Sequence, residues 1–145
     1  MHTVRIKDQN YLYVNADNGF SGKHILLVED NELNKEITKE ILREHGFIID
    51  TADDGLQALE RIESSEPGDY DLVLMDIQMP VMDGYEASKR IRSLDNSRLA
   101  SIPVIAMTAN VFSEDRRKAA ECGMNGFIAK PIVVEEMITA LKSVF

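Results

Sequence analysis

The sequence predicts an α/β fold in which a parallel β-sheet carries helices on both faces. From Lys23 onward, short apolar runs alternate with segments whose apolar residues recur at helical period. Several runs are apolar at nearly every position, which is typical of strands covered on both faces. Strands that alternate with helices are joined by right-handed crossovers, and such crossovers make neighbouring strands parallel.

Five apolar runs are the predicted strands. Each has the length of a typical strand and is followed by a polar or helical segment. In chain order they are HILLV (24–28), FIIDTA (47–52), DLVLMD (71–76), IPVIAMT (102–108) and GFIAK (126–130).

The first of five predicted helices follows the first strand and ends at Gly46. Leu33, Ile37 and Ile41 recur at four-residue steps, which predicts one apolar face. Acid–base pairs at i,i+3, such as Glu32 with Lys35, are expected on the wet side. Leu33 and Ile37 are expected either to pack in the core or to form a docking face for a partner.

The other four helices follow the remaining strands. An Asp before Leu56 caps the second, and Asp83 caps the third with Glu86 three residues on. The fourth and fifth span about 113–123 and 133–145. PIVVEEM lacks a polar cap, so the start of the last helix is expected to fray.

Composition limits the function classes. A chain of 145 residues that is 44% hydrophobic fits one domain. Its net charge of −9 argues against nucleic acid as a partner, because phosphate binding depends on Lys and Arg. No apolar stretch approaches the roughly 20 residues of a membrane span, so we expect a soluble, cytoplasmic protein without direct membrane insertion. Residues 1–22 are expected to be a tail or linker, or a short hairpin of TVRIK and YLYVN.

Polar side chains stand where the predicted strands end. They are Glu29, Asp30, Asp76, Thr108 and Lys130. Because ligands bind open parallel sheets at the carboxyl ends of strands, we expect these five residues to converge. Three carboxylates at close range repel one another unless a cation lies among them. Oxygen ligands without His or Cys favour Mg²⁺, with Mn²⁺ as a substitute.

The chemistry that these groups suit is phosphoryl transfer. A carboxylate such as Asp76 can act as the nucleophile and become an acyl phosphate. The Lys130 ammonium and the Thr108 hydroxyl can then contact phosphoryl oxygens. Taken singly, each residue has a simpler interpretation as a helix cap, a strand residue or a surface lysine. Those interpretations would have to coincide at the ends of four strands.

The motifs themselves resemble a known family. ILLVEDNELNKEI, DLVLMDIQMPVMDGYEA, IPVIAMTAN and GFIAKPI are similar to the signature segments of receiver domains of two-component response regulators. The resemblance covers about residues 23–145. It implies a flavodoxin-like doubly wound five-stranded parallel sheet of order 2-1-3-4-5 with five helices.

The resemblance also implies roles for individual residues. Asp76 would accept a phosphoryl group from a phosphohistidine, with Thr108 as the switch hydroxyl and Lys130 as the essential lysine. Glu29, Asp30, Asp76 and the backbone carbonyl of Gln78 would hold Mg²⁺. The Lys130–Pro131 peptide bond would be cis, which proline makes accessible.

Two further roles follow from the resemblance. Phe127 matches the aromatic switch position, although a core-packing role is as well supported by its apolar strand. Gln78 and Asn110 occupy the positions that tune the lifetime of the phosphoryl group. Because neither is charged, we expect intermediate to slow hydrolysis.

The wording of the motifs most resembles receivers of hybrid sensor histidine kinases. The chain is interpreted as a module of such a kinase, a monomer or weak dimer that exchanges phosphoryl groups with a histidine kinase or a histidine phosphotransfer domain. The module itself would catalyse only its own phosphorylation and dephosphorylation. The sequence leaves open whether the parent protein is a histidine kinase. The rival classes are a flavodoxin-like redox protein, a phosphatase of the haloacid dehalogenase type and a docking module that takes no phosphate.

Overall fold

The computed structural model describes residues 19–109 and 113–145. In this part of the chain five strands form one sheet, namely β2 (His24–Val28), β3 (Ile48–Ala52), β4 (Leu72–Asp76), β5 (Val104–Thr108) and β6 (Gly126–Ala129). The strand order is β3-β2-β4-β5-β6, and all neighbours are parallel. Numbered along the chain this is order 2-1-3-4-5, so the predicted doubly wound sheet is confirmed.

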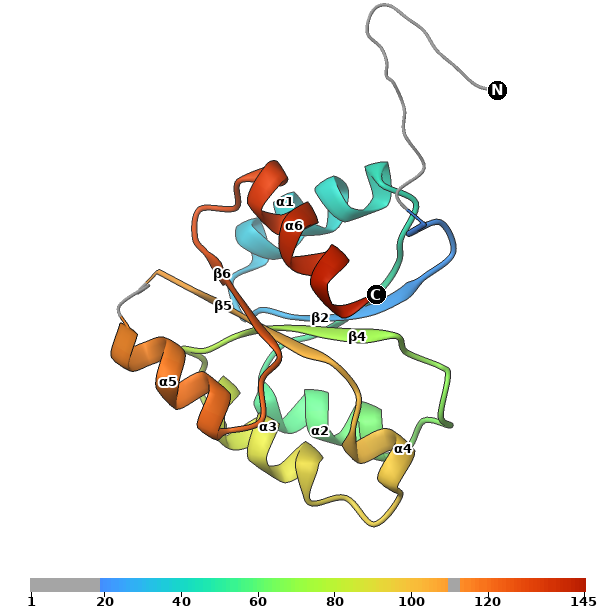
Figure 1. Cartoon of the computed structure of the whole chain (residues 1–145), viewed down its shortest axis with the longest axis vertical. Coiled ribbons are helices and arrows are strands. Elements are labelled where there is room, and N and C mark those ends of the chain that lie inside the picture. Colours follow the sequence, from blue (N-terminus) through green and yellow to red (C-terminus); the bar gives the residue numbers. More distant parts are fainter. Residues whose placement is uncertain (1–18, 110–112) are drawn as a thin grey trace, which may run out of the picture.

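Helices cover both faces of the sheet (Figure 1). One face carries α1 (Glu32–Glu44) and α6 (Val134–Val144), and the other carries α2 (Gly55–Glu63), α3 (Gly84–Arg92) and α5 (Ser113–Glu121). Strand β2 shows the consequence, because Ile25 and Leu27 belong to one apolar core and Leu26 and Val28 to the other. Burial on two sides explains why the strands are apolar at nearly every position.

The expectation of five helices is incomplete. In the described ranges a sixth, α4 (Ser97–Ala100), forms a single turn before β5. The Asn96 side chain caps it, accepting hydrogen bonds from the backbone N–H groups of Arg98 and Leu99 at 3.0 and 3.2 Å. One turn is too short to show an apolar repeat, so sequence period could not reveal it. Among the described residues, no helix has the length and apolar character needed to cross a bilayer.

The predicted helix caps are confirmed at α2 and α3. Asp54 Oδ1 accepts from the backbone N–H of Gln57 at 2.9 Å, and Asp83 Oδ1 accepts from that of Glu86 at 2.8 Å. Before α6, as far as the described residues go, Val133 makes no capping bond through its side chain, as predicted. The Asp caps define where α2 and α3 begin, directly after the loops at the ends of β3 and β4.

The orientation of α1 excludes the core alternative for Leu33 and Ile37 and contradicts the expected exposure of Lys35. Leu33 is 68% exposed and Ile37 is 50% exposed, so most of the predicted apolar stripe faces solvent. Lys35 was expected on the wet side, yet its ammonium contacts Asp53 after β3. Burial of this ammonium is tolerated because the Asp53 carboxylate pairs with it. The buried residues of α1 are Lys35, Thr38 and Leu42.

The chain upstream of Lys23 takes part in the fold. Phe20 is 1% exposed, and its ring centroid lies 5.0 Å from that of Phe47 and 5.8 Å from that of Phe145. The backbone N–H of Gly22 donates to the carbonyl of Gly46 at 2.9 Å. These contacts fasten the entry of the chain to the ends of α1 and α6. The hairpin expected within residues 1–22 falls on 1–18, outside the described residues.

Candidate functional site

The ends of the central strands bring the three predicted carboxylates together. Glu29 directly follows β2 and Asp76 ends β4, and these two strands are neighbours in the sheet. One carboxylate oxygen from each of Glu29, Asp30 and Asp76 lies within 4.8 Å of the others. Glu29 is only 1% exposed, Asp76 is buried and Asp30 is exposed. The cluster therefore has a buried floor and one carboxylate at its rim.

Lys130 reaches the same cluster from the edge of the sheet. Lys130 directly follows β6. Its Nζ donates to Glu29 Oε1 at 2.6 Å and to Asp76 Oδ2 at 2.9 Å. Its backbone N–H donates to the carbonyl of Thr108 at 2.8 Å, which aligns the ends of β5 and β6. The Lys130–Pro131 peptide bond is cis.

The charges of the cluster are unbalanced. Burial, together with the neighbouring carboxylate of Asp76, raises the pKa of Glu29 to about 7, against the opposing effect of Lys130. Burial would lower the pKa of Lys130, but its hydrogen bonds to Glu29 and Asp76 raise it above its ordinary value. The cluster thus holds three carboxyl groups and only one ammonium, which contacts Glu29 and Asp76, so an additional cation would be attracted to the site.

The donor set fits a hard divalent cation. The cluster offers carboxylate oxygens from Glu29, Asp30 and Asp76, and these are the ligands that Mg²⁺ prefers in proteins. An open cleft of about 640 Å³, lined in part by Asp30, Gln78 and Thr108, adjoins it. Such a cleft leaves room for metal-bound waters and for a phosphoryl group.

The backbone after Asp76 shapes that cleft. The N–H of Gln78 donates to Asp76 Oδ1 at 3.3 Å, so the side chain of Asp76 is held from both sides. Further along the same loop, Val81 is 77% exposed and has a φ of 69°. A β-branched residue is strained in this left-handed region, and such strain is often found at functional sites. The hydrophobic periodicity of the sequence does not reveal this left-handed backbone at Val81.

Thr108 and Phe127 lie on the neighbouring strands β5 and β6. Thr108 is buried at the end of β5 and lines the cleft. Phe127 pairs in register with Ala106 and is half-buried against the core on the α5 side. The Arg116 guanidinium lies over its ring, 5.7 Å from the centroid. Asn110, the second predicted lifetime position, is outside the described residues.

Two charged residues of α5 were not singled out from the sequence. Asp115 and Lys118 line the cleft, and Lys118 Nζ lies 4.5 Å from the centroid of the Tyr85 ring on α3. Their segment, SEDRRKAAECG, is rich in charges, so nothing in it distinguishes these two residues from their solvated neighbours. Only the placement of α5 beside the cleft reveals them.

Comparison with known proteins agrees with this geometry. Residues 25–142 match the model of the response regulator receiver domain. The chain is 42% identical over 123 residues to hybrid signal transduction histidine kinase B of Dictyostelium discoideum, covering 79% of this chain and 6% of that protein. It is 38% identical over 140 residues to transcription factor SKN7 of Saccharomyces cerevisiae, covering 94% of this chain and 21% of that protein. The chain thus spans a small part of the curated relatives it matches.

Solved structures give the same result. The receiver domain of sensor histidine kinase PA1611 from Pseudomonas aeruginosa, which has a magnesium ion in its active-site cleft, is 39% identical with a TM-score of 0.74, covering 86% of this chain and 98% of that one. The receiver domain of yeast Ssk1, solved with the histidine phosphotransfer protein Ypd1, is 29% identical with a TM-score of 0.75, covering 87% and 94%. The sheet order, the converging acids and lysine, and the matched family model together show that this chain belongs to the response regulator receiver domains of two-component phosphorelays.

Proposed function

We propose that Asp76 is the phosphoacceptor of this receiver domain and takes its phosphoryl group from a phosphohistidine. The observation that carries the proposal is the Lys130 ammonium, which bridges Glu29 and Asp76 beside an open cleft. An ammonium in this position can stay with the carboxylate before transfer and contact a phosphoryl oxygen afterwards.

The transfer step is a displacement at phosphorus. One oxygen of the Asp76 carboxylate attacks, the bond between phosphorus and the donor imidazole nitrogen breaks, and an acyl phosphate forms. The nitrogen keeps the electron pair of the broken bond, and the donor leaves as neutral imidazole because its other ring nitrogen carries a proton taken up before transfer. The Thr108 hydroxyl, which lines the same cleft, donates a hydrogen bond to a phosphoryl oxygen.

Glu29, Asp30, Asp76 and the backbone carbonyl of Gln78 would hold the divalent ion. Mg²⁺ suits this oxygen set, and Mn²⁺ would serve as a substitute. A bound ion neutralises negative charge on the phosphoryl group and fixes its orientation for attack. Support comes from the clustered carboxylates and from the magnesium ion in the related Pseudomonas receiver domain.

Conformational output would pass through Thr108 and Phe127. Contact between Thr108 and the phosphoryl group vacates space beside β5, and the Phe127 ring turns into it. The Arg116 guanidinium lies over the half-buried ring, so this turn would also change that contact. The ring signals of Phe127, followed by NMR, should therefore change on addition of beryllofluoride and Mg²⁺, and unchanged signals would contradict this coupling.

The lifetime of the phosphoryl group would depend on Gln78 and Asn110. Neither side chain is a general base, so hydrolysis of phospho-Asp76 should be intermediate to slow. The side chain of Gln78 is exposed at the cleft, within reach of an attacking water. Substituting Gln78 by Glu or Lys should change the decay rate of phospho-Asp76, and an unchanged rate would refute the assignment.

The docking partner would be a histidine phosphotransfer domain or the histidine kinase itself. Leu33 and Ile37 are exposed on the part of α1 that follows the Glu29–Asn31 loop, so they offer an apolar surface beside the acceptor. The related Ssk1 receiver was solved with such a phosphotransfer protein. We propose that this module belongs to a hybrid sensor histidine kinase and is a monomer or weak dimer. Residues 1–22 would be the connecting segment and 23–145 the receiver. Phe20, although it belongs to the connecting segment, packs in the core of the receiver.

One experiment tests the central proposal. The protein is incubated with acetyl phosphate and Mg²⁺, and intact mass is measured for the wild type, for Asp76→Asn and for Asp115→Asn. Asp115 lines the same cleft on α5 and serves as a matched carboxylate control. The wild type and Asp115→Asn should gain one phosphoryl group that Asp76→Asn does not. Labelling of Asp76→Asn, or none in the wild type, would refute the assignment.

A further inference from the structure

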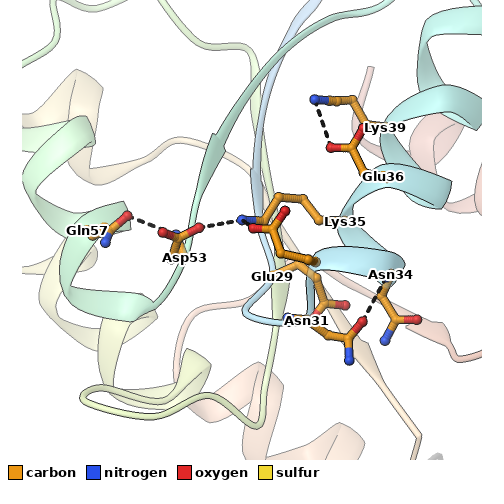
Figure 2. A network of polar contacts seen from close by, with 9 residues as sticks. Glu29, Asn31, Asn34, Lys35, Glu36, Lys39, Asp53 and Gln57 are labelled. Atoms are coloured by element: carbon orange, nitrogen blue, oxygen red, sulfur yellow. Dashed lines mark hydrogen bonds and ion pairs between the residues drawn. The ribbon is translucent and has the colours of Figure 1, made fainter.

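Lys35 is a buried lysine outside the phosphoryl-transfer cluster. It lies near the start of α1, and its side chain is 6% exposed. Its ammonium donates to Glu32 Oε1 at 2.9 Å and to Asp53 Oδ1, which belongs to the loop between β3 and α2 (Figure 2). We call the contact between Lys35 and Asp53 the latch.

Both partners of the latch are charged. Burial would lower the pKa of Lys35, but its hydrogen bonds to Asp53 and Glu32 raise it above its ordinary value. Lys35 in turn holds the pKa of Asp53 below its ordinary value. The loop carrying Asp53 is itself fixed, because the Asp53 backbone N–H donates to Gln57 Oε1 at 3.0 Å (Figure 2).

The latch closes a ring around the loop that joins β2 to α1. At the start of this loop, the backbone N–H of Glu29 donates to the carbonyl of Ala52 at 3.1 Å. At its end, the backbone N–H of Lys35 donates to the carbonyl of Asn31 at 2.9 Å, and the Lys35 side chain contacts Asp53. Both ends of the loop are thus fastened to the same two consecutive residues, Ala52 and Asp53.

We infer that Lys35 is a positioning residue for the metal site, because the latch sets where Asp30 stands. The inference rests on the proposed function, in which Asp30 is a metal ligand. Glu29 is buried and held by Lys130, so it depends little on the latch. Asp30 is exposed and stands midway along the loop, so its position follows from how the two ends are held. Removing a group that orients a metal ligand typically lowers metal affinity about 10- to 100-fold.

The test separates geometry from charge. Lys35→Met combined with Asp53→Asn removes one positive and one negative charge, so the net charge of the chain is unchanged. The matched control is Lys39→Met with Glu36→Gln, which removes a neighbouring ion pair of 3.1 Å that stays within α1 (Figure 2). Mg²⁺ affinity is measured by isothermal titration calorimetry, and folding by far-UV circular dichroism and thermal unfolding.

We expect the latch variant to bind Mg²⁺ about tenfold more weakly than the wild type. The control pair should bind Mg²⁺ as the wild type does. The single variant Lys35→Arg, which keeps the positive charge, should retain most of the wild-type affinity. A folded latch variant with wild-type Mg²⁺ affinity overturns the inference, even if it unfolds at a lower temperature. If the double variant does not fold, Asp53→Asn against Glu36→Gln gives the same comparison with one charge removed from each.

The outcomes also distinguish this inference from the proposed function. A wild type that binds Mg²⁺ but gains no phosphoryl group from acetyl phosphate refutes the phosphoacceptor role and leaves the latch intact. A wild type that is phosphorylated, beside a latch variant of unchanged affinity, refutes only the latch. A wild type that binds no Mg²⁺ overturns both.

Discussion

Gly84 is the point at which a single added carbon should disable the acceptor. It begins α3, and its backbone N–H donates to the carbonyl of Ile77 at 2.9 Å. A Cβ at this position would lie 2.4 Å from the carbonyl oxygen of Asp76 and 3.0 Å from the Cα of Ile77. The substitution Gly84→Ala therefore drives the helix against the backbone that carries Asp76.

The size of the effect follows from these distances. Ordinary contact begins at 3.4 Å, so the helix and the strand end must separate by about 1 Å. Both surfaces are backbone, and no side-chain rotation can relieve the overlap. Overpacking of this kind lowers the free energy of unfolding by about 1–3 kcal/mol. A displacement of about 1 Å at a reacting group lowers the reaction rate about 100-fold.

Gly55 provides the matched control. A Cβ there would lie 2.4 Å from the carbonyl oxygen of Met82, an equal overlap that does not involve Asp76. Urea unfolding and the rate of phosphorylation by acetyl phosphate are measured for Gly84→Ala and Gly55→Ala. We expect similar losses of stability and about a 100-fold loss of rate in Gly84→Ala alone. Equal phosphorylation rates in the two variants would refute the argument.

Three further predictions concern the strained loop, a half-buried arginine and the pH dependence of metal binding. Val81→Asn should raise the free energy of unfolding by about 1 kcal/mol in urea titrations, because Asn tolerates the left-handed φ of 69°. Arg92→Ala should lower it by about 3 kcal/mol, because the side chain donates five hydrogen bonds, four of them to backbone carbonyls. Mg²⁺ affinity, measured calorimetrically from pH 6 to 8, should rise as pH passes about 7, because binding requires the Glu29 carboxylate, whose pKa is raised to about 7.

Each of these predictions has its own control. A Val81→Asn variant no more stable than the wild type would show that the loop is not strained. Arg90→Ala, which breaks an exposed pair with Glu86 on the same helix, should cost only about 0.5 kcal/mol, and an equal loss in both arginine variants would contradict the role of Arg92. Without metal, the protonated form of Glu29 favours the fold, so its contribution is full below pH 4.5 and is lost as pH rises through about 7. Glu29→Gln should abolish both dependences.

The sheet and the cluster of carboxylates around Lys130 were predictable for one physical reason. A parallel sheet buried on two faces requires apolar runs, so the strands show in the sequence. The same topology brings the carboxyl ends of all strands to one edge, so polar residues at the ends of runs must meet there. Glu29, Asp76 and Lys130 follow from this rule without any knowledge of side-chain packing.

What the sequence does not reveal depends on contacts between distant segments. Phe20 stands alone between polar residues and glycines, and only Phe47 and Phe145 make it part of the core. Lys35 has the spacing of a solvated i,i+3 partner of Glu32, and only the approach of the β3–α2 loop buries it. In both cases the local pattern is compatible with exposure, and tertiary contacts decide the outcome.

The exposure of Leu33 and Ile37 on α1 fits the proposed docking face. A helix that exposes Leu33 and Ile37 leaves apolar surface in water, and burying such a side chain would contribute about 1.5–3 kcal/mol. The fold keeps them outside because Thr38 and Leu42, with the paired Lys35, already fill the space against the sheet. This apolar stripe begins directly after the Glu29–Asn31 loop, so it lies beside the proposed acceptor. Under the proposed function, the stripe would provide binding energy where a phosphoryl donor docks, and its period would then reflect a partner surface rather than the core of this domain.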